Sequence, residues 1–127
     1  MLLIDTDVIV WYLRGNERAR KAIESEKSFL ISVVTYMELV QGMRNMHELR
    51  LLRGALRNWN AKVIYINEEI SSKAMSYVER YFLSNSLELA DALIAATAVV
   101  NGLDVLTGNM KHYRIVKELR LKVFKIR

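Results

Sequence analysis

The chain is 127 residues long, carries a formal net charge of +5 and contains neither cysteine nor proline. This length suits one domain with a hydrophobic core, so we expect a single domain over residues 1–127. Without cysteine, a disulfide framework, a thiolate zinc site and a thiol nucleophile are excluded. No apolar run reaches the roughly 18 residues of a membrane span, and the N-terminus lacks a basic lead-in. We therefore expect a cytoplasmic protein with no membrane segment.

Apolar residues alternate between short runs and helical spacing along the chain. Short, β-rich runs fall at residues 2–5, 28–32, 62–66, 104–107 and 122–126, and helical spacing fills residues 8–13, 33–45, 47–58, 68–83 and 87–101. This alternation predicts an α/β fold, with a parallel sheet of about five short strands and helices on both faces. In such sheets, ligands bind beyond the carboxyl ends of the strands, where the strand order reverses.

Two aspartates interrupt the apolar run "MLLIDTDVIVWYL" at the end of the first predicted strand. A carboxylate in such surroundings is costly unless something pairs with it, so Asp5 and Asp7 are candidate site residues. The same position also suits Asp7 as the N-cap of the helix over 8–13, and both interpretations remain open. Thr107, Gly108 and Asn109 stand at the carboxyl end of the fourth strand, at the same edge, whereas Asp104 stands at the amino end of that strand, on the opposite edge, and is interpreted as a turn residue.

Asp91 lies in the apolar stretch "SNSLELADALIAATAVVNG". With Ser86 as the N-cap, Asp91 falls beyond the first turn, on a face shared with Ile94, Ala95 and Ala98. It is then a half-buried acid with no local partner. The alternative is a structural salt bridge to a distant lysine or arginine.

Glu38 lies in "SVVTYMELVQG", where Thr35 and Glu38 have the spacing of a capping box. Ser32 is the better N-cap, because the residues after it already show helical spacing. This places Glu38 inside the helix, on a small polar strip, and favours a role in the site over a cap. His47 and His112 lie among charged residues and are predicted to be surface histidines.

The positive charge favours a polyanionic partner, although a solvated basic surface gives the same total. Seven Lys or Arg residues lie between positions 111 and 127, against the single acid Glu118. Lys111 comes directly after the predicted site edge, and Arg114 and Lys117 follow at helical spacing. These three are the first candidates for contacts to phosphate.

The segments "LLIDTDVIVWYLRG", "ISVVTYMELVQG", "LELADALIAATAVVNG" and "VLTGNMKHY" resemble, in order and spacing, the PIN-domain nucleases and specifically the VapC-type toxins of toxin–antitoxin pairs. The resemblance covers nearly the whole chain. It implies a three-layer sandwich and a metal-dependent endoribonuclease whose acidic pocket binds Mg²⁺ or Mn²⁺. Carried over residue by residue, the catalytic and metal-binding acids are Asp5, Glu38 and Asp91, with Thr6 and Thr107 lining the pocket.

This chain has Asn109 where many relatives have a fourth acid, so we expect one well-held ion rather than two. The resemblance also implies an RNA substrate and a small antitoxin that places a basic side chain among the acids. A homodimer is expected because the helix over 68–83 carries more apolar residues than one core-facing stripe needs: Met75, Tyr77, Val78, Tyr81, Phe82 and Leu83.

Two alternatives remain. The first is a PIN-like module that has lost catalysis and only binds RNA or a partner, which Asn109 favours. The second is a HAD-type phosphatase, because "LLIDTDVI" nearly matches the nucleophile motif of that class. The later aspartate pair and the lysine of the phosphatase class are hard to place in this sequence, and the chain is too short to include a cap domain.

Overall fold

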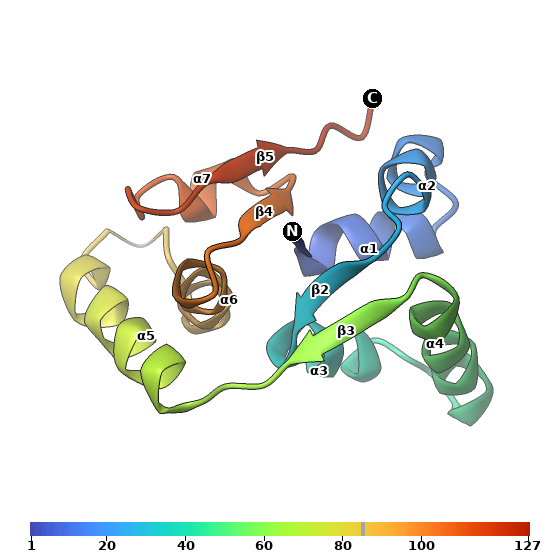
Figure 1. Cartoon of the computed structure of the whole chain (residues 1–127), viewed down its shortest axis with the longest axis horizontal. Coiled ribbons are helices and arrows are strands. Elements are labelled where there is room, and N and C mark those ends of the chain that lie inside the picture. Colours follow the sequence, from blue (N-terminus) through green and yellow to red (C-terminus); the bar gives the residue numbers. More distant parts are fainter. Residues whose placement is uncertain (85) are drawn as a thin grey trace.

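A parallel sheet forms the centre of the fold (Figure 1). The computed structural model describes residues 1–84 and 86–127, and within them the sheet has five strands in the order β3-β2-β1-β4-β5. All neighbouring strands are parallel. The strands are β1 (Leu2–Ile4), β2 (Phe29–Ser32), β3 (Ala61–Ile64), β4 (Asp104–Thr107) and β5 (Leu121–Val123). The predicted α/β fold with a parallel sheet is therefore confirmed.

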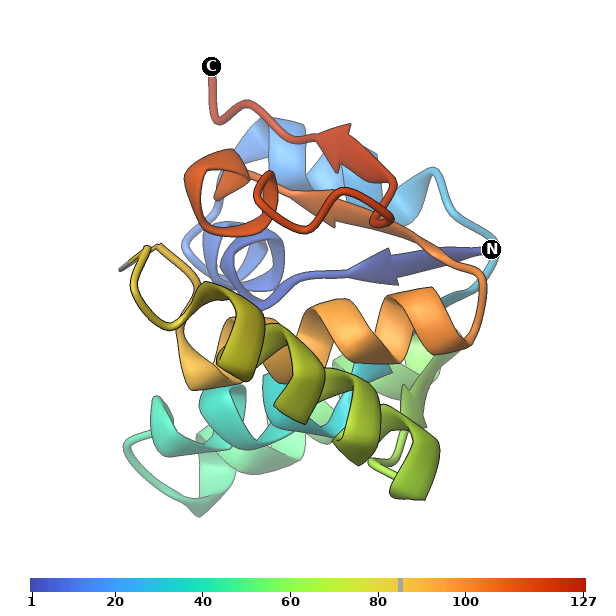
Figure 2. The same ribbon diagram turned by 90° about the vertical axis from the view of Figure 1, so that its left-hand side faces the viewer.

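Helices cover both faces of the sheet (Figures 1 and 2). The helices of the described residues are α1 (Thr6–Leu13), α2 (Glu17–Glu24), α3 (Val33–Gln41), α4 (Met46–Asn58), α5 (Glu68–Tyr81), α6 (Leu89–Val100) and α7 (Met110–Tyr113). Side chains of β1 alternate between two cores. Leu3 packs with α5 and α6, whereas Leu2 and Ile4 pack with α1, α2 and α4. The result is a three-layer sandwich.

The strand order reverses at β1. The chain builds β2 and β3 on one side of β1 and then crosses to add β4 and β5 on the other. The carboxyl ends of β1 and β4 lie side by side, because Ile4 pairs with Leu106. This is the position at which open α/β sheets bind ligands.

Local sequence explains most of the helix boundaries. Asn16, Asn45 and Asn67 each cap a helix by accepting the backbone N–H three residues later. The helix predicted over 33–45 ends earlier, at Gln41, and α2 was not predicted because its sequence is mostly charged. No helix within residues 1–84 and 86–127 combines the length and apolar character needed to span a membrane.

The interpretation of Asp104 as a turn residue is wrong. Asp104 begins β4, and its Oδ1 lies 2.5 Å from Nε of Arg120 in an exposed ion pair. Its predicted place at the amino end of the strand, away from the site, is correct.

Candidate active site

Asp5 lies at the carboxyl end of β1 and is 3% exposed. Its Oδ1 accepts hydrogen bonds from the Thr6 backbone N–H at 2.8 Å and from the Tyr113 hydroxyl at 3.1 Å. Its Oδ2 accepts a hydrogen bond from the Thr107 hydroxyl at 2.8 Å. Burial and the negative charge of Asp7 raise the pKa of Asp5 to about 7, although the three hydrogen bonds oppose the rise.

Asp7 lies in the first turn of α1 and does not cap that helix, because Asp5 occupies the N-cap position. The capping interpretation of Asp7 is therefore wrong. Its Oδ2 accepts a hydrogen bond from the Gly108 backbone N–H at 2.9 Å. Its Oδ1 is buried without a hydrogen-bond partner, and no other described side-chain N or O atom is in that state. Burial raises the pKa of Asp7.

Glu38 lies inside α3, as predicted, because Ser32 caps this helix by accepting the Val34 N–H at 3.0 Å. The Thr6 hydroxyl donates to Glu38 Oε1 at 2.7 Å and also lies 3.0 Å from the Thr35 hydroxyl. Thr6 follows Asp5 directly in the chain, so its hydroxyl links the position of Asp5, at the end of β1, to Glu38 of α3.

Asp91 is the third residue of α6, and its Oδ2 accepts the backbone N–H of Glu88 at 3.0 Å. Glu88, not Ser86, is the N-cap, so the predicted cap is wrong. The expectation that Asp91 has no local partner is also wrong. His112 Nδ1 lies 3.3 Å from Asp91 Oδ2, so this histidine contacts the candidate site instead of lying alone on the surface.

The Tyr113 hydroxyl bonds to Asp5 and lies within the electrostatic range of two further carboxylates, Asp91 and Asp7. Burial raises the pKa of the Tyr113 hydroxyl, and the charges of Asp5, Asp91 and Asp7 act in the same direction. Within residues 1–84 and 86–127, however, no three His, Asp or Glu side chains come close enough to form a complete protein ligand set for a metal ion. The candidate site is thus an edge of linked acids, which we call the acidic edge: Asp5, Asp7, Glu38 and Asp91.

This donor set fits Mg²⁺. Mg²⁺ takes oxygen ligands, keeps several waters and commonly binds through one or two carboxylates, so a closed cage of side chains is not required. The unpaired Oδ1 of Asp7 is a buried oxygen available to a cation. No basic side chain forms a described hydrogen bond or ion pair with Asp5 or Asp7.

Comparison with known proteins identifies the family. The model of the PIN domain matches residues 2–118. The chain belongs to the PIN-domain family. It is 36% identical over 124 residues to Ribonuclease VapC10 of Mycobacterium tuberculosis, covering 94% of this chain and 91% of that protein. It is 26% identical over 125 residues to Ribonuclease VapC1 of Methanocaldococcus jannaschii, covering 97% of this chain and 86% of that protein.

Solved structures share the fold of this PIN domain. A toxin–antitoxin complex from Klebsiella pneumoniae has a chain with a TM-score of 0.81 and 26% identity, covering 100% of this chain and 98% of that one. VapBC2 from Rickettsia felis, bound to a promoter DNA fragment, has a TM-score of 0.82 and 16% identity, with 98% of both chains covered. The second likeness shows the fold alone.

The basic residues predicted to contact phosphate, Lys111, Arg114 and Lys117, follow the Thr107 end of β4 closely in sequence. Asn109 precedes α7, and its backbone N–H donates to the Thr107 hydroxyl at 2.9 Å. Lys111 lies in α7 and Arg114 is its C-cap residue. The helical spacing predicted as far as Lys117 is wrong, because α7 ends at Tyr113. All three basic side chains are exposed.

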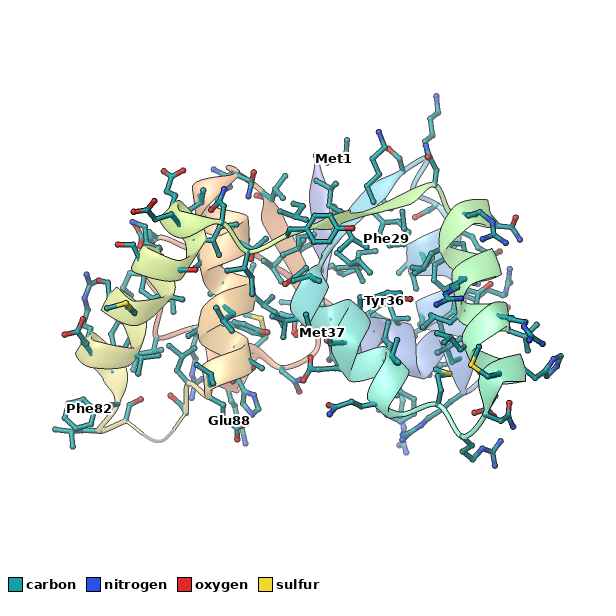
Figure 3. The ribbon with its side chains drawn as sticks, turned by 90° about the horizontal axis from the view of Figure 1, so that it is seen from below. Met1, Phe29, Tyr36, Met37, Phe82 and Glu88 are labelled. Carbon is teal, nitrogen blue, oxygen red and sulfur yellow. The ribbon has the colours of Figure 1, made fainter. Side chains whose placement is uncertain are left out.

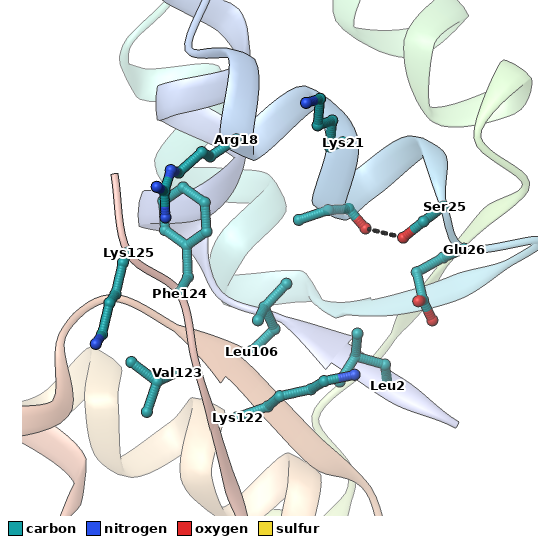
Figure 4. Close-up of a pocket in the computed structure, with 11 residues that line it drawn as sticks. Leu2, Arg18, Lys21, Ser25, Glu26, Leu106, Lys122, Val123, Phe124 and Lys125 are labelled. Atoms are coloured by element: carbon teal, nitrogen blue, oxygen red, sulfur yellow. Dashed lines mark hydrogen bonds between the residues drawn. The ribbon is translucent and has the colours of Figure 1, made fainter. Parts of the chain in front are cut away.

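Sequence reasoning missed a groove of about 520 Å³ between α2 and β5 (Figure 4). Its lining includes the basic side chains of Arg18, Lys21, Lys122 and Lys125, one acid (Glu26), and an apolar floor that includes Leu2, Leu106 and Phe124. We call this groove, with its apolar floor and its four cations, the basic groove. The Phe124 N–H donates to the Thr107 carbonyl at 2.8 Å, which joins the groove to the acidic edge. Its two halves lie about a hundred residues apart, so no single segment indicates it.

Proposed function

We propose that this protein is a metal-dependent endoribonuclease and the toxin component of a type II toxin–antitoxin pair. The observation that carries the proposal is the acidic edge at the reversal point of the sheet, in a chain 36% identical over most of its length to Ribonuclease VapC10. The reaction is hydrolysis of an RNA phosphodiester bond with Mg²⁺ or Mn²⁺. The protein acts in the cytoplasm.

Asp5, Asp91 and Glu38 would hold the ion. When bound, the ion lowers the pKa of a coordinated water and neutralises charge on the scissile phosphate. The chain's own hydrogen bonds orient these carboxylates. Thr107 and Tyr113 fix Asp5, Thr6 fixes Glu38, and the Glu88 N–H fixes Asp91.

Exposed cations on both sides of the sheet would capture the RNA backbone. Lys111 and Arg114 are close in sequence to Tyr113, which packs in the core under α5 and α6. Phe124 lines the basic groove and packs in the core on the other face of the sheet. The acidic edge lies at the end of the strands between them. Lysine and arginine on either side offset the repulsion between the acids and the phosphates of the RNA.

The proposed partners are a small antitoxin and a second copy of this chain. The Klebsiella pneumoniae structure of similar fold is a toxin–antitoxin complex. An arginine from an antitoxin suits the acidic edge, because its planar fork matches carboxylates in two-point contacts. For the dimer, the end of α5 leaves Phe82 66% exposed and Leu83 81% exposed, and Figure 3 shows Phe82 directed away from the ribbon.

A PIN-like module that binds RNA without cutting it is the second candidate. Asn109 in place of a fourth acid favours it, as does the lack of a three-carboxylate cluster among the described residues. The phosphatase alternative loses its support, because the PIN model accounts for residues 2–118.

Two aspartate-to-asparagine variants test the proposal. Asparagine is as good an N-cap as aspartate, so Asp5→Asn removes charge without removing the cap of α1. Asp91→Asn likewise keeps an acceptor for the Glu88 N–H. We expect both variants to be folded and to cleave no RNA with Mg²⁺ or Mn²⁺, and EDTA to stop the wild type. Asp104→Asn, at the opposite edge, is the matched control and should cleave normally. Full activity in either site variant would overturn the assignment.

A further inference from the structure

The hydrogen bonds of the acidic edge show which carboxylate has acceptor capacity left. A carboxylate offers about four lone-pair positions. Asp5 uses three of them, for Thr6, Tyr113 and Thr107. Asp7 uses one, for the Gly108 N–H, and this bond goes to Oδ2. Asp7 Oδ1 therefore has no hydrogen-bond partner although the atom is buried, and the nearby backbone N–H groups of Val8 and Asp7 act on this carboxylate by lowering its pKa.

A buried oxygen without a partner costs free energy, and a charged one costs more. Asp7 lies two residues after Asp5, and the two carboxylates accept hydrogen bonds from neighbouring residues of one turn, Asp5 from the Thr107 hydroxyl and Asp7 from the Gly108 N–H. Two carboxylates in such proximity repel unless a cation lies between them or one of them is protonated. No basic side chain bonds to either one among the described hydrogen bonds and ion pairs.

The chain is also shaped to hold Asp7 in this place. A Cβ at position 108 would lie 2.7 Å from Asp7 Oδ2 and 3.3 Å from the Phe124 carbonyl oxygen. Glycine is therefore needed for the backbone N–H to approach the carboxylate. This bond fixes Oδ2 and leaves Oδ1 as the oxygen of the carboxylate without a partner.

We propose that Asp7 is a direct ligand of the divalent cation through Oδ1, and that it shares the ion with Asp5. The inference rests on the proposed function, because it concerns the same ion. The competing explanation is that Asp7 only ties α1 to the turn after β4. A tie requires an acceptor and no charge, so asparagine separates the two explanations: its amide oxygen still accepts the Gly108 N–H, while the anionic oxygen is gone.

The test measures Mn²⁺ binding by calorimetry on the whole chain, at about pH 8 so that the carboxylates are ionised. We expect Asp7→Asn to weaken Mn²⁺ at least about tenfold, the range seen when metal-site groups are removed. Asp104→Asn should bind Mn²⁺ as the wild type does. In EDTA, the thermal unfolding midpoint of Asp7→Asn should equal or exceed that of the wild type, because the repulsion between the carboxylates of Asp5 and Asp7 has been removed. Equal Mn²⁺ affinity in Asp7→Asn would overturn the inference.

A measurement on the wild type avoids any question of whether the variant folds. Titration with Mg²⁺, followed by carbon NMR of the side-chain carboxyl groups, should shift the Asp7 signal together with that of Asp5. An Asp7 signal that stays in place while Asp5 moves would overturn the inference. Wild type that binds Mn²⁺ but cleaves no RNA would overturn the proposed function and leave the role of Asp7 intact. Wild type that binds no Mn²⁺ would overturn both.

Discussion

The Tyr113 hydroxyl donates a hydrogen bond to Asp5 Oδ1 at 3.1 Å, across 108 positions of sequence. Tyr113 is almost fully buried, so this donor faces little competition from water. The bond favours the ionised form of Asp5 and works against the rise of its pKa.

Tyr113→Phe should therefore raise the pKa of Asp5 further and weaken metal binding. A hydrogen bond to a charged group contributes about 1.5–3 kcal/mol, so we expect a loss of several-fold or more in RNA cleavage near neutral pH. The loss should shrink as pH rises. Tyr12→Phe, which removes an exposed bond to Glu24, is the control. Equal pH profiles for Tyr113→Phe and the wild type would contradict this role.

Gly108→Ala should displace the Asp7 carboxylate, because the new methyl group would lie 2.7 Å from its Oδ2. Forcing extra atoms into a packed position costs about 1–3 kcal/mol, which chemical denaturation can measure. Cleavage should fall as well. Gly54→Ala is the matched control. Its Cβ would meet only the end of the Arg57 side chain at 3.9 Å, so this helix substitution should stabilise the protein.

The metal-free protein should lose stability as pH rises from about 4 to about 7. The pKa of folded Asp5 is about 7, whereas that of an aspartate in the unfolded chain is 3.8. The folded state then binds more protons than the unfolded state in this window, so the free energy of unfolding falls with pH. The full shift corresponds to about 4 kcal/mol. Denaturation in EDTA should show the fall, and Asp5→Asn should reduce it. A flat profile for the wild type would contradict the environment described for Asp5.

RNA binding should depend on salt through two groups of cations. With Asp5→Asn as the inactive background, log affinity should fall linearly with log salt, by about 0.7 for each phosphate contact to a single strand. Alanine at Lys111, Arg114 and Lys117 should reduce this slope, and so should alanine at Lys21, Lys122 and Lys125 of the basic groove.

Three exposed arginines of α4 supply the control for removed charge. Alanine at Arg50, Arg53 and Arg57 changes the net charge equally and should leave the slope nearly unchanged. If all three triple variants behave alike, general charge and not these two surfaces captures the RNA.

Phe82 and Leu83 should hold two copies of the chain together. Both are large, apolar and mostly exposed at the end of α5. Sedimentation at micromolar concentration should give a dimer, and alanine at Phe82 and at half-buried Tyr81 should shift it towards monomer. Alanine at Leu51, an exposed apolar residue on α4, is the control. A monomer in the wild type would contradict the dimer.

Local patterns predicted much of this molecule. The strands fell close to their observed places, because β-rich runs between helical periods are a property of neighbouring residues. Asp5 and Thr107 were both placed at strand ends, and the parallel register brought them into contact. The cap at Ser32 was also predicted, because N-cap preference depends on only a few residues.

One error was local and the others arose where a distant contact decides the structure. Ser86 is a better N-cap by preference than Glu88, but α6 begins after Glu88, which forms a capping box with Asp91 three residues later. His112 looked like a surface residue because its partner, Asp91, lies 21 positions earlier. The basic groove brings α2 beside β5, and no local signal predicts which distant segments lie together.

The pairing of β1 with β4 has a consequence for how this protein is made. Asp5 leaves the ribosome first, but Thr107 and Tyr113, which hold it, are 102 and 108 positions further along the chain. A nascent chain, or one released early by a stop codon, has the first aspartate without its partners. Under the proposed function, the enzyme that cuts RNA is assembled only after the segment that carries Thr107 and Tyr113 has been translated.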